Sequence, residues 1–387
     1  MVPRERKNHL QSFLFSVCTI FFFFGFVEAV FRVAGYEPVF HYKTYAIPSW
    51  MKEMDPLVLE RYKQFVAGQG FVNEDIYAYQ PDIRYGYRLK PNRSITVQNY
   101  SSALVVDKLP PWTIYSGRDG FRVHSKGRVD AGSAEKTVHV LGDSSSFGWG
   151  VDYEKIYSFL LVEKLNSIAS PSSWHFNLRN LSLPGFSSFD GKLLWEEFGN
   201  IKKGDWVVLS FGSNDSYPSF QTDRSQYESR NSLVGKINWN LKHLLLFRWM
   251  RTWLVKRPGR EHETGFGRRV PLTQYRKNLE FLVDEIRKRQ AHPALVSICN
   301  FSEYQETARQ TAVNKKIVYL NFPTELKPFL PTIHNRYPDL FVTYFEAYGK
   351  DMEANPMLVF QFPDHCHPNE IGHSLISEVL FDKFEVH

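Results

Sequence analysis

Short apolar runs alternate with segments of helical periodicity from residue 137 to the end of the sequence. This alternation is typical of parallel βαβ units, in which each helix carries the chain back to the start of the next strand. It predicts an α/β fold, a three-layer α/β/α sandwich around a mainly parallel five-stranded sheet. The strands are expected at 137–142, 175–183, 205–212, 293–300 and 357–362. The helices are expected at 156–168, 188–201, 274–290 and 369–384.

Two long connections interrupt this pattern within the domain expected at 137–387. Residues 216–270 separate the third strand from its helix, and residues 301–356 separate the fourth strand from the last one. Connections of this length are usually functional or lack regular structure. We therefore expect both to be insertions that make the substrate-facing surface larger than that of a minimal domain of this fold.

The N-terminus carries an apolar run that is long enough to cross a bilayer. Residues 10–27 contain no charged residue, and residues 1–9 before them are basic. The length fits a membrane-spanning helix, and the positive-inside rule places the basic end in the cytoplasm. We expect a signal-anchor at 10–30 of a single-pass protein whose domain is extracytoplasmic, and periplasmic in a Gram-negative cell. A cleaved signal peptide and a buried helix are the alternatives, although no clear cleavage site follows the run.

Residues 31–136 differ in composition from the domain that follows them. They are rich in Tyr, Pro, Asn and Gly, which favours a stalk with flanking extended segments. Short strands with turns are expected at 85–92 and 118–127. The net charge of +6 is modest, and the sequence has neither zinc-finger spacing nor interleaved aromatic and basic residues. Nucleic acid is therefore not an expected partner.

Three adjacent serines, residues 144–146, follow the first predicted strand. A serine hydroxyl becomes a nucleophile only when a base accepts its proton and a third group orients that base. Asp364 and His367 lie three residues apart in a turn before the last helix, so the carboxylate can contact one imidazole nitrogen while the other points outward. The alternative is a helix-entry turn in which Asp364 is only a cap.

Two further strand ends carry groups that can donate hydrogen bonds to an oxyanion. Gly185 follows the second strand, where its backbone N–H can approach a ligand closely, and Asn214 follows the third strand with a side-chain amide. An ordinary turn glycine and a loop-capping asparagine are the alternatives. Sites in open α/β sheets lie outside the carboxyl ends of the strands, so these groups are expected at one edge.

The order of these motifs resembles that of the SGNH hydrolases, also called the GDSL esterase/lipase superfamily. The matching segments are GDSS (142–145), the region of Gly185, GSND (212–215) and DHCHP (364–368), and the resemblance covers residues 137–385. Three more segments are similar to membrane-anchored bacterial members, namely YGYRLKPN (85–92), RDGFR (118–122) and FGWGV (147–151). Ser145 stands where the GDSL signature has leucine.

The resemblance implies a role for each matching residue. Ser144 is the nucleophile, His367 is the general base and then the general acid, and Asp364 orients it. The backbone amides of Ser144 and Gly185 and the side chain of Asn214 form the oxyanion hole, and Asp143 fixes the turn. Neither a metal nor a cofactor is implied. Beyond the resemblance, Ser145 and Ser146 are expected to cap backbone amides at the start of the next helix.

These residues predict a serine esterase that hydrolyses an O-acetyl or other short acyl ester of a cell-envelope carbohydrate or lipid. One alternative is an O-acyltransferase that passes the acyl group to a polysaccharide hydroxyl, and another is a catalytically silent envelope-binding module. A metal site built on Asp364, His365, Cys366 and His367 is disfavoured. Four consecutive residues in a compact turn cannot all face one ion, and no partner with ligand spacing is evident elsewhere.

The cysteines and one basic segment leave further alternatives open. Cys18, Cys299 and Cys366 form no disulfide framework, and two free thiols at Cys299 and Cys366 are favoured over a pair. Residues 232–257 contain six Lys or Arg residues and no acidic residue, with apolar residues at helical spacing. A helix packed on the core with a solvated basic face is favoured. A lid, or a helix on an anionic membrane surface, is the alternative.

Overall fold

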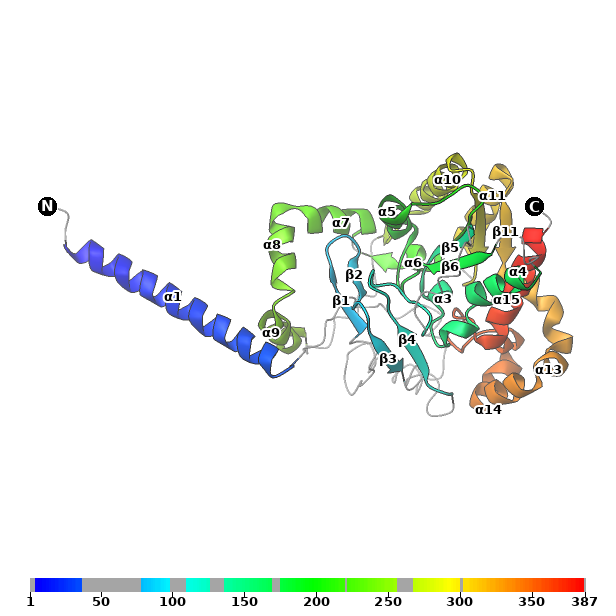
Figure 1. Cartoon of the computed structure of the whole chain (residues 1–387), viewed down its shortest axis with the longest axis horizontal. Coiled ribbons are helices and arrows are strands. Elements are labelled where there is room, and N and C mark those ends of the chain that lie inside the picture. The colour runs from blue at the N-terminus through cyan, green and yellow to red at the C-terminus, as the bar shows by residue number, and fades with distance from the viewer. Residues whose placement is uncertain are drawn as a thin grey trace.

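The computed structural model describes residues 4–36, 78–97, 109–125, 136–168, 175–219, 221–255, 267–299 and 302–385. Its centre is a five-stranded sheet in which all strand pairs are parallel, in the order β11-β10-β7-β5-β6 (Figure 1). The middle strand β7 (Trp206–Ser210) is buried along its whole length. The other strands are β5 (Lys136–Gly142), β6 (Phe176–Asn180), β10 (His292–Ser297) and β11 (Val318–Asn321). The predicted five-stranded α/β fold is thus confirmed.

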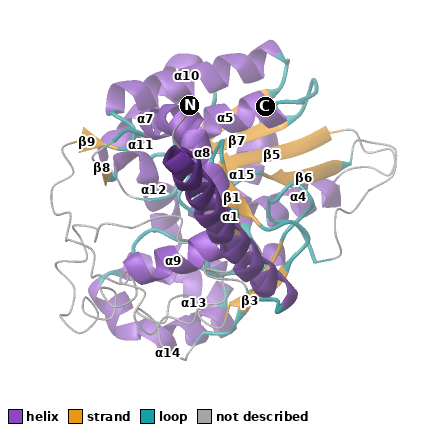
Figure 2. Cartoon of the chain, turned by 90° about the vertical axis from the view of Figure 1, so that its left-hand side faces the viewer, coloured by secondary structure: helices purple, strands orange, loops and turns teal. Residues whose placement is uncertain are grey.

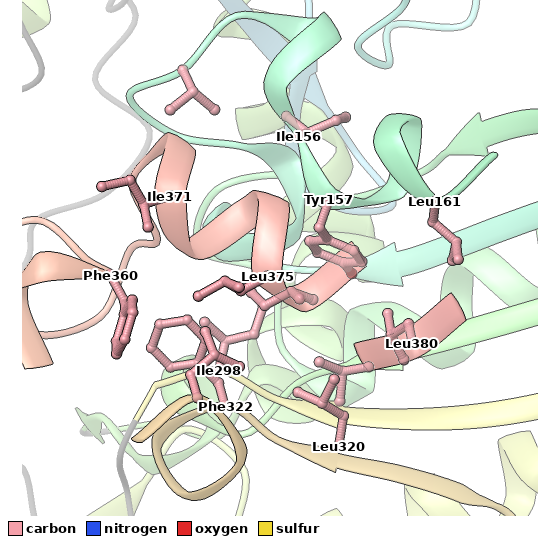
Figure 3. Close-up of a cluster of buried hydrophobic side chains, with 14 of the residues drawn as sticks. Ile156, Tyr157, Leu161, Ile298, Leu320, Phe322, Phe360, Ile371, Leu375 and Leu380 are labelled. Atoms are coloured by element: carbon pink, nitrogen blue, oxygen red, sulfur yellow. The ribbon is translucent and has the colours of Figure 1, made fainter. Parts of the chain in front are cut away.

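Helices cover both faces of the sheet and build a hydrophobic core on each. Helices α4 (Tyr157–Ile168) and α15 (Glu370–Glu385) pack against each other on one face. Figure 3 shows part of this core, where Leu375 lies among Tyr157, Ile298 and Phe322. The other face carries α5 (Ser188–Phe198), α10 (Leu272–Lys288) and α11 (Ser302–Lys315).

The alternation of side chains along β7 shows why this strand reads as a continuous apolar run. Val208 belongs to the core under α4 and α15, whereas Val207 and Leu209 belong to the core under α5 and α10. Successive side chains of a strand point to opposite faces, and both faces of this sheet are covered. A central strand of a three-layer sandwich therefore has no polar side.

The fifth strand is not where the sequence predicted it. Residues 357–362 form no strand, because Pro356–Val359 is a 3-10 helix that Asn355 caps through Met357 N. The edge strand is β11, four residues long, and it lies within residues 301–356, which we expected to be an insertion. A short apolar run indicates that a segment is buried, but periodicity alone cannot tell a strand from another buried segment.

The remainder of the predicted insertion 301–356 is largely helical. After β11 it forms α12 (Phe322–Leu326), a 3-10 helix (Lys327–Thr332), α13 (Ile333–Arg336) and α14 (Pro338–Ala354).

The described residues of the other long connection, 216–219, 221–255 and 267–270, form a helical arm on the side of the domain that faces α1 (Figure 2). Its strands β8 (Pro218–Ser219) and β9 (Gly267–Arg268) pair with each other. Between them lie α7 (Asp223–Asn231), α8 (Leu233–Leu241) and α9 (Leu245–Val255). The favoured prediction, a helix packed on the core by its apolar face, is wrong for α8, because its apolar side chains are exposed.

The described part of the predicted stalk packs on the domain. Strands β1 (Tyr79–Asp82) and β2 (Gly86–Leu89) form one antiparallel pair, and β3 (Ser94–Val97) and β4 (Trp112–Tyr115) form another. Their buried aromatic and aliphatic side chains join the core under α5 and α10. Residues 37–77, 98–108 and 126–135, which the stalk prediction also covers, lie outside the described residues.

The N-terminal residues form helix α1 (Arg4–Val33), which projects away from the sheet domain (Figure 1). Its stretch Gln11–Val33 is long and apolar enough to cross a membrane, and none of its most apolar window is buried. A signal sequence near an N-terminus meets the same criteria of length and hydropathy.

Candidate active site

The first strand end carries Ser144 on a one-turn helix, α3 (Ser144–Phe147). Asp143 caps this helix, because its carboxylate accepts a hydrogen bond from Ser145 N at 2.9 Å. Gly148 ends the helix in the left-handed region at φ +82°, which favours glycine. The short turn therefore presents Ser144 at the carboxyl edge of the central sheet.

The three serines have different environments. Ser144 is partly exposed, whereas Ser145 and Ser146 are buried. The prediction that Ser145 and Ser146 cap backbone amides is wrong for the contacts observed. Ser146 Oγ lies 2.7 Å from the Tyr157 hydroxyl, and Ser145 Oγ lies 3.2 Å from Cys299 Sγ. Ser144 is thus the hydroxyl of this run that reaches the surface of the sheet edge.

The turn before α15 brings His367 to Ser144. His367 Nε2 lies 2.6 Å from Ser144 Oγ, across 223 residues of sequence. Phe362 N donates to His367 O at 2.9 Å and closes the turn. The backbone of His365 lies in the left-handed region at φ +58°, which allows the chain to reverse its direction within this turn.

The Asp364 carboxylate holds the imidazole from the other side. One of its oxygens accepts a hydrogen bond from His367 Nδ1. The other accepts from the backbone N–H groups of Cys366 at 2.9 Å and His367 at 3.0 Å. With Nδ1 donating to the carboxylate, Nε2 has a lone pair that faces the serine hydroxyl. The geometry is that of a nucleophile, a base and a group that orients the base.

The charge of Asp364 sets the protonation of His367. Burial alone would lower the pKa of the imidazole, because desolvation disfavours its charged form. The negative charge and the hydrogen bond of Asp364 outweigh burial and raise the pKa above its usual value, with a further contribution from Asp143. His367 is therefore a stronger proton acceptor than an unperturbed histidine.

Cys366 forms a disulfide with Cys299, so the favoured prediction of two free thiols is wrong. Their Cα atoms lie 4.4 Å apart, and 67 residues of sequence separate them. Cys299 follows β10, so the bond joins the turn that carries Asp364 and His367 to a fourth strand end. The bond also removes Cys366 from any ligand set, and His365 Nδ1 instead lies 3.2 Å from Asn355 Nδ2. In the described ranges, no group of three or more His, Cys, Asp or Glu residues could hold a metal ion.

Gly185 lies in the turn after β6, at φ +79°, where a side chain would be strained. Its carbonyl oxygen accepts a hydrogen bond from Arg269 Nη1 at 2.9 Å, and Arg269 is itself held by a 2.6 Å ion pair with Asp223. The Tyr87 hydroxyl donates to the preceding carbonyl of Pro184. The orientation of the peptides around Gly185 is thus fixed from two sides.

Asn214 lies on α6 (Ser213–Ser216), the turn after β7. Its Nδ2 donates to Asp143 Oδ2 at 3.3 Å, so the amide is tied to the residue before Ser144. The structure therefore brings Asn214 and Ser144 to one edge of the sheet, as their places at strand ends predicted.

Asp215 joins the Gly185 and Asn214 turns to each other. Its buried carboxylate accepts hydrogen bonds from Gly212 N and Ser188 N, each at 3.0 Å, and from the Ser188 hydroxyl at 2.5 Å. Burial raises the pKa of this carboxyl to about 7, in spite of these hydrogen bonds. Asp215 lies inside the GSND segment, but no feature of the sequence predicts its contact with Ser188.

Arg122 supports the end of α3 and the segment that follows it, and no role was predicted for this arginine from the sequence. Its buried guanidinium donates to the carbonyl oxygens of Phe147 (2.9 Å), Gly148 (2.8 Å), Val151 (2.7 Å) and Thr113 (3.0 Å). Burial lowers the pKa of this arginine to about 10, which leaves it charged at neutral pH. Residues before the main domain thus help to hold the turn that carries Ser144.

Comparison with known proteins gives a family match and several distant structures. No curated protein matches the chain. The esterase EstA from Pseudoalteromonas sp. is 16 % identical, over 65 % of this chain and 97 % of that one, with a TM-score of 0.35. The acetylxylan esterase Axe2 from Geobacillus stearothermophilus is 15 % identical, over 65 % and 94 %, with a TM-score of 0.37. The lipase/acylhydrolase from Enterococcus faecalis is 14 % identical, over 65 % and 96 %, with a TM-score of 0.36.

The sequence model of the GDSL-like lipase/acylhydrolase family matches residues 140–375, which is more than half of the chain. The match begins in β5, just before Ser144, and ends in α15, just after His367. It therefore spans all the strand ends described above. The chain belongs to the GDSL-like lipase/acylhydrolase (SGNH hydrolase) family and is a serine hydrolase that acts on ester bonds.

Proposed function

We propose that the protein is an esterase that forms an acyl-enzyme at Ser144, with His367 as general base and Asp364 as the group that orients it. The observation that carries this proposal is the chain of contacts from Ser144 Oγ to His367 Nε2 (2.6 Å) and from His367 Nδ1 to Asp364. In this arrangement the base faces the nucleophile before any substrate binds.

The reaction follows from these positions. Ser144 Oγ bonds to the acyl carbon of the ester while its proton passes to His367 Nε2. The imidazolium, stabilised by Asp364, gives that proton to the departing alkoxide when the ester bond breaks, and the alcohol leaves. Water then donates a proton to His367 and attacks the acyl carbon. The Ser144–acyl bond breaks, the imidazolium returns the proton to Ser144 Oγ, and a carboxylic acid is released.

The negative oxygen of the tetrahedral intermediate needs donors that are already in place. We assign this role to the backbone N–H groups of Ser144 and Gly185 and to Asn214 Nδ2. The contact between Asn214 and Asp143 supports the assignment, because it orients the amide toward the residue that precedes the nucleophile. The hydrogen bond from Arg269 to Gly185 O supports it too, since it fixes the plane of a neighbouring peptide.

The proposed substrate is an O-acetyl or other short acyl ester of a carbohydrate or lipid in the cell envelope. Two observations support an extracytoplasmic site. Helix α1 is apolar enough to be a membrane anchor and follows a basic N-terminus, which the positive-inside rule assigns to the cytoplasm. The Cys299–Cys366 disulfide is typical of proteins outside the reducing cytosol.

The proposal is tested with the full chain in detergent, on p-nitrophenyl esters of graded acyl length and on acetylated glycans. We expect turnover that is highest with short acyl groups, and labelling by a fluorophosphonate probe. The Ser144→Ala variant should lose both, whereas the exposed Ser167→Ala control should keep both. Full activity in Ser144→Ala would refute the assignment of the nucleophile.

The same experiment distinguishes the alternatives. Transfer of acetyl to an added sugar, without release of acetate in its absence, would identify an O-acyltransferase. Absence of both turnover and probe labelling in a folded wild-type protein would identify a catalytically silent binding module.

A further inference from the structure

The helical arm contains the basic and apolar segment 232–257, whose described part, up to Val255, comprises α8 and α9. Figures 1 and 2 both show α8 and α9 on the side of the domain from which α1 projects. The arm is fastened to the domain at the end of α7. There, Arg230 donates hydrogen bonds to the carbonyl oxygens of Ile83 at 3.2 Å and Arg84 at 3.0 Å.

The other end of the arm is fastened to α1. Leu246 N, in the first turn of α9, donates to the Glu28 carboxylate at 2.9 Å. The ring of Trp249 lies 6.2 Å from that of Phe31, measured between centroids. These α1 residues belong to the last turns of the apolar stretch Gln11–Val33. Because an apolar span ends where the bilayer meets water, α9 starts at the level of the membrane interface.

Helix α8 exposes an apolar face. Leu233, Val234, Ile237 and Leu241 expose between 40 and 77 % of their surface, and their spacing places them on one side of the helix. The opposite side carries Trp239, which is buried, with Lys242 Nζ over its ring at 4.2 Å. Single exposed apolar residues are common on soluble proteins, but a contiguous exposed face marks a binding surface.

The charge of the arm indicates what this surface binds. Residues 232–257 carry six Lys or Arg residues and no acidic residue. A helix that combines one apolar face with neighbouring basic residues binds at the surface of a membrane that contains anionic lipid. Helix α9 contacts the end of α1, and only residues 242–244 separate α8 from α9, so α8 lies close to the membrane that α1 would enter.

We propose that the exposed apolar face of α8 is a membrane-docking surface, embedded at the headgroup boundary of the anionic leaflet that α1 enters. This inference rests on the membrane anchor in the proposed function. The domain then has two attachments to the membrane, α1 and α8, with α9 joining them. Two attachments restrict rotation of the domain about the α1 axis, so that a fixed face of the sheet domain is turned to the membrane.

The test uses the full chain in vesicles that contain phosphatidylglycerol. An environment-sensitive fluorophore is attached at Ile237→Cys in a Cys18→Ser background, so that the native disulfide is untouched. The matched control is Val313→Cys on α11, which is 62 % exposed and lies on the side of the domain away from α1. We expect nitroxide-labelled lipid to quench the label at 237 at least several-fold more than the label at 313. Acrylamide in the water should quench the label at 313 more.

A second variant tests whether the apolar face, and not the attached label, is responsible for the quenching. A label at Leu241→Cys should be quenched by lipid when residue 237 is Ile, and should lose this quenching when Ile237→Glu adds a charge to the apolar face. Equal quenching of labels 237 and 313, in protein that stays with the vesicles after a carbonate wash, would overturn the docking surface and leave the anchor intact. Protein that washes off the vesicles would instead refute the anchor, and with it this inference.

Discussion

Cys366 is bonded to Cys299, so a covalent link enters the turn before α15 between Asp364 and His367. The bond joins two ends of the site that are distant in sequence, the turn before α15 and the end of β10. Asp364 also accepts the backbone N–H of Cys366, which makes the position of the cysteine part of the hydrogen-bond pattern that orients the imidazole.

Removal of this disulfide should weaken both stability and turnover. For a loop closed over 67 residues, loop-closure entropy predicts a loss of about 4 kcal/mol in the free energy of unfolding. The Cys299→Ser variant should therefore unfold at lower denaturant concentration. It should also have a lower kcat with a smaller change in KM, because the turn that carries His367 gains freedom. Denaturant titration and steady-state kinetics on a soluble aryl ester measure the two effects.

The control is the free cysteine of α1. Cys18→Ser should leave stability and kcat unchanged. Treatment of wild type with dithiothreitol should reproduce the Cys299→Ser kinetics. Full activity in the reduced wild type would show that the remaining hydrogen bonds hold the turn without the covalent link.

The raised pKa of His367 predicts the acid side of the pH profile. Only neutral His367 can accept the Ser144 proton, so kcat/KM falls as pH drops through the pKa of the free enzyme. Because Asp364 raises that pKa, the fall should begin above the usual histidine value of about 6.5. In Asp364→Asn the pKa falls, so the acid limb should move to lower pH while kcat drops by about 10³–10⁴-fold.

Rate profiles on a soluble aryl ester across the acid range distinguish this effect from unfolding. The exposed Asp351→Asn serves as the control, and its profile should match that of wild type. If the acid limb of Asp364→Asn stays where it is in wild type, a group other than His367 controls the titration.

Much of the central fold could be predicted, because a strand that is buried on both faces appears in the sequence as a continuous apolar run. Strand β7 lies under helices on both faces, and its five residues are all buried. The edge strand β11 is four residues long and only half buried, so its pattern is weak. Residues 357–362, in contrast, were predicted to form a strand and do not form one. Leu358 and Phe360 are buried in a core, but they lie in and beside a 3-10 helix, because an apolar run does not specify backbone pairing.

The same limit applies to the candidate site. Ser144, Asn214 and Gly185 follow parallel strands, and strand ends of such a sheet meet at one edge, so their proximity could be inferred from order alone. The Cys299–Cys366 bond could not be inferred from order in the sequence, because disulfide pairing depends on where two distant segments meet in space. Arg269 and Arg122 act on carbonyl oxygens of the backbone, and sequence carries no signal for such contacts.

Asn214→Ala should lower kcat by about 10²–10³-fold with little change in KM, because the amide is assigned to the oxyanion of the transition state. The contact with Asp143 is lost as well, so fluorophosphonate labelling should slow but persist, since Ser144 and His367 are intact. Steady-state kinetics of Asn214→Ala and of the exposed Asn240→Ala control give the comparison. A rise in KM at constant kcat would assign Asn214 to substrate binding instead.

Arg122→Ala should destabilise the fold and displace the nucleophile turn. The loss leaves four buried or half-buried carbonyl oxygens without this donor, so we expect a free energy of unfolding lower by at least about 3 kcal/mol. Arg122→Lys should recover only part of this, because an ammonium group cannot contact several carbonyls in the planar arrangement of a guanidinium.

The matched control for Arg122 is Arg118, an exposed arginine in the turn that precedes it. Arg118→Ala removes the same charge from the same segment and should leave the midpoint of thermal unfolding unchanged. At a temperature where Arg122→Lys stays folded, its kcat should still be below that of wild type, because Phe147 ends the helix that carries Ser144 and Gly148 caps it. A folded Arg122→Lys with wild-type kcat would limit the role of Arg122 to stability.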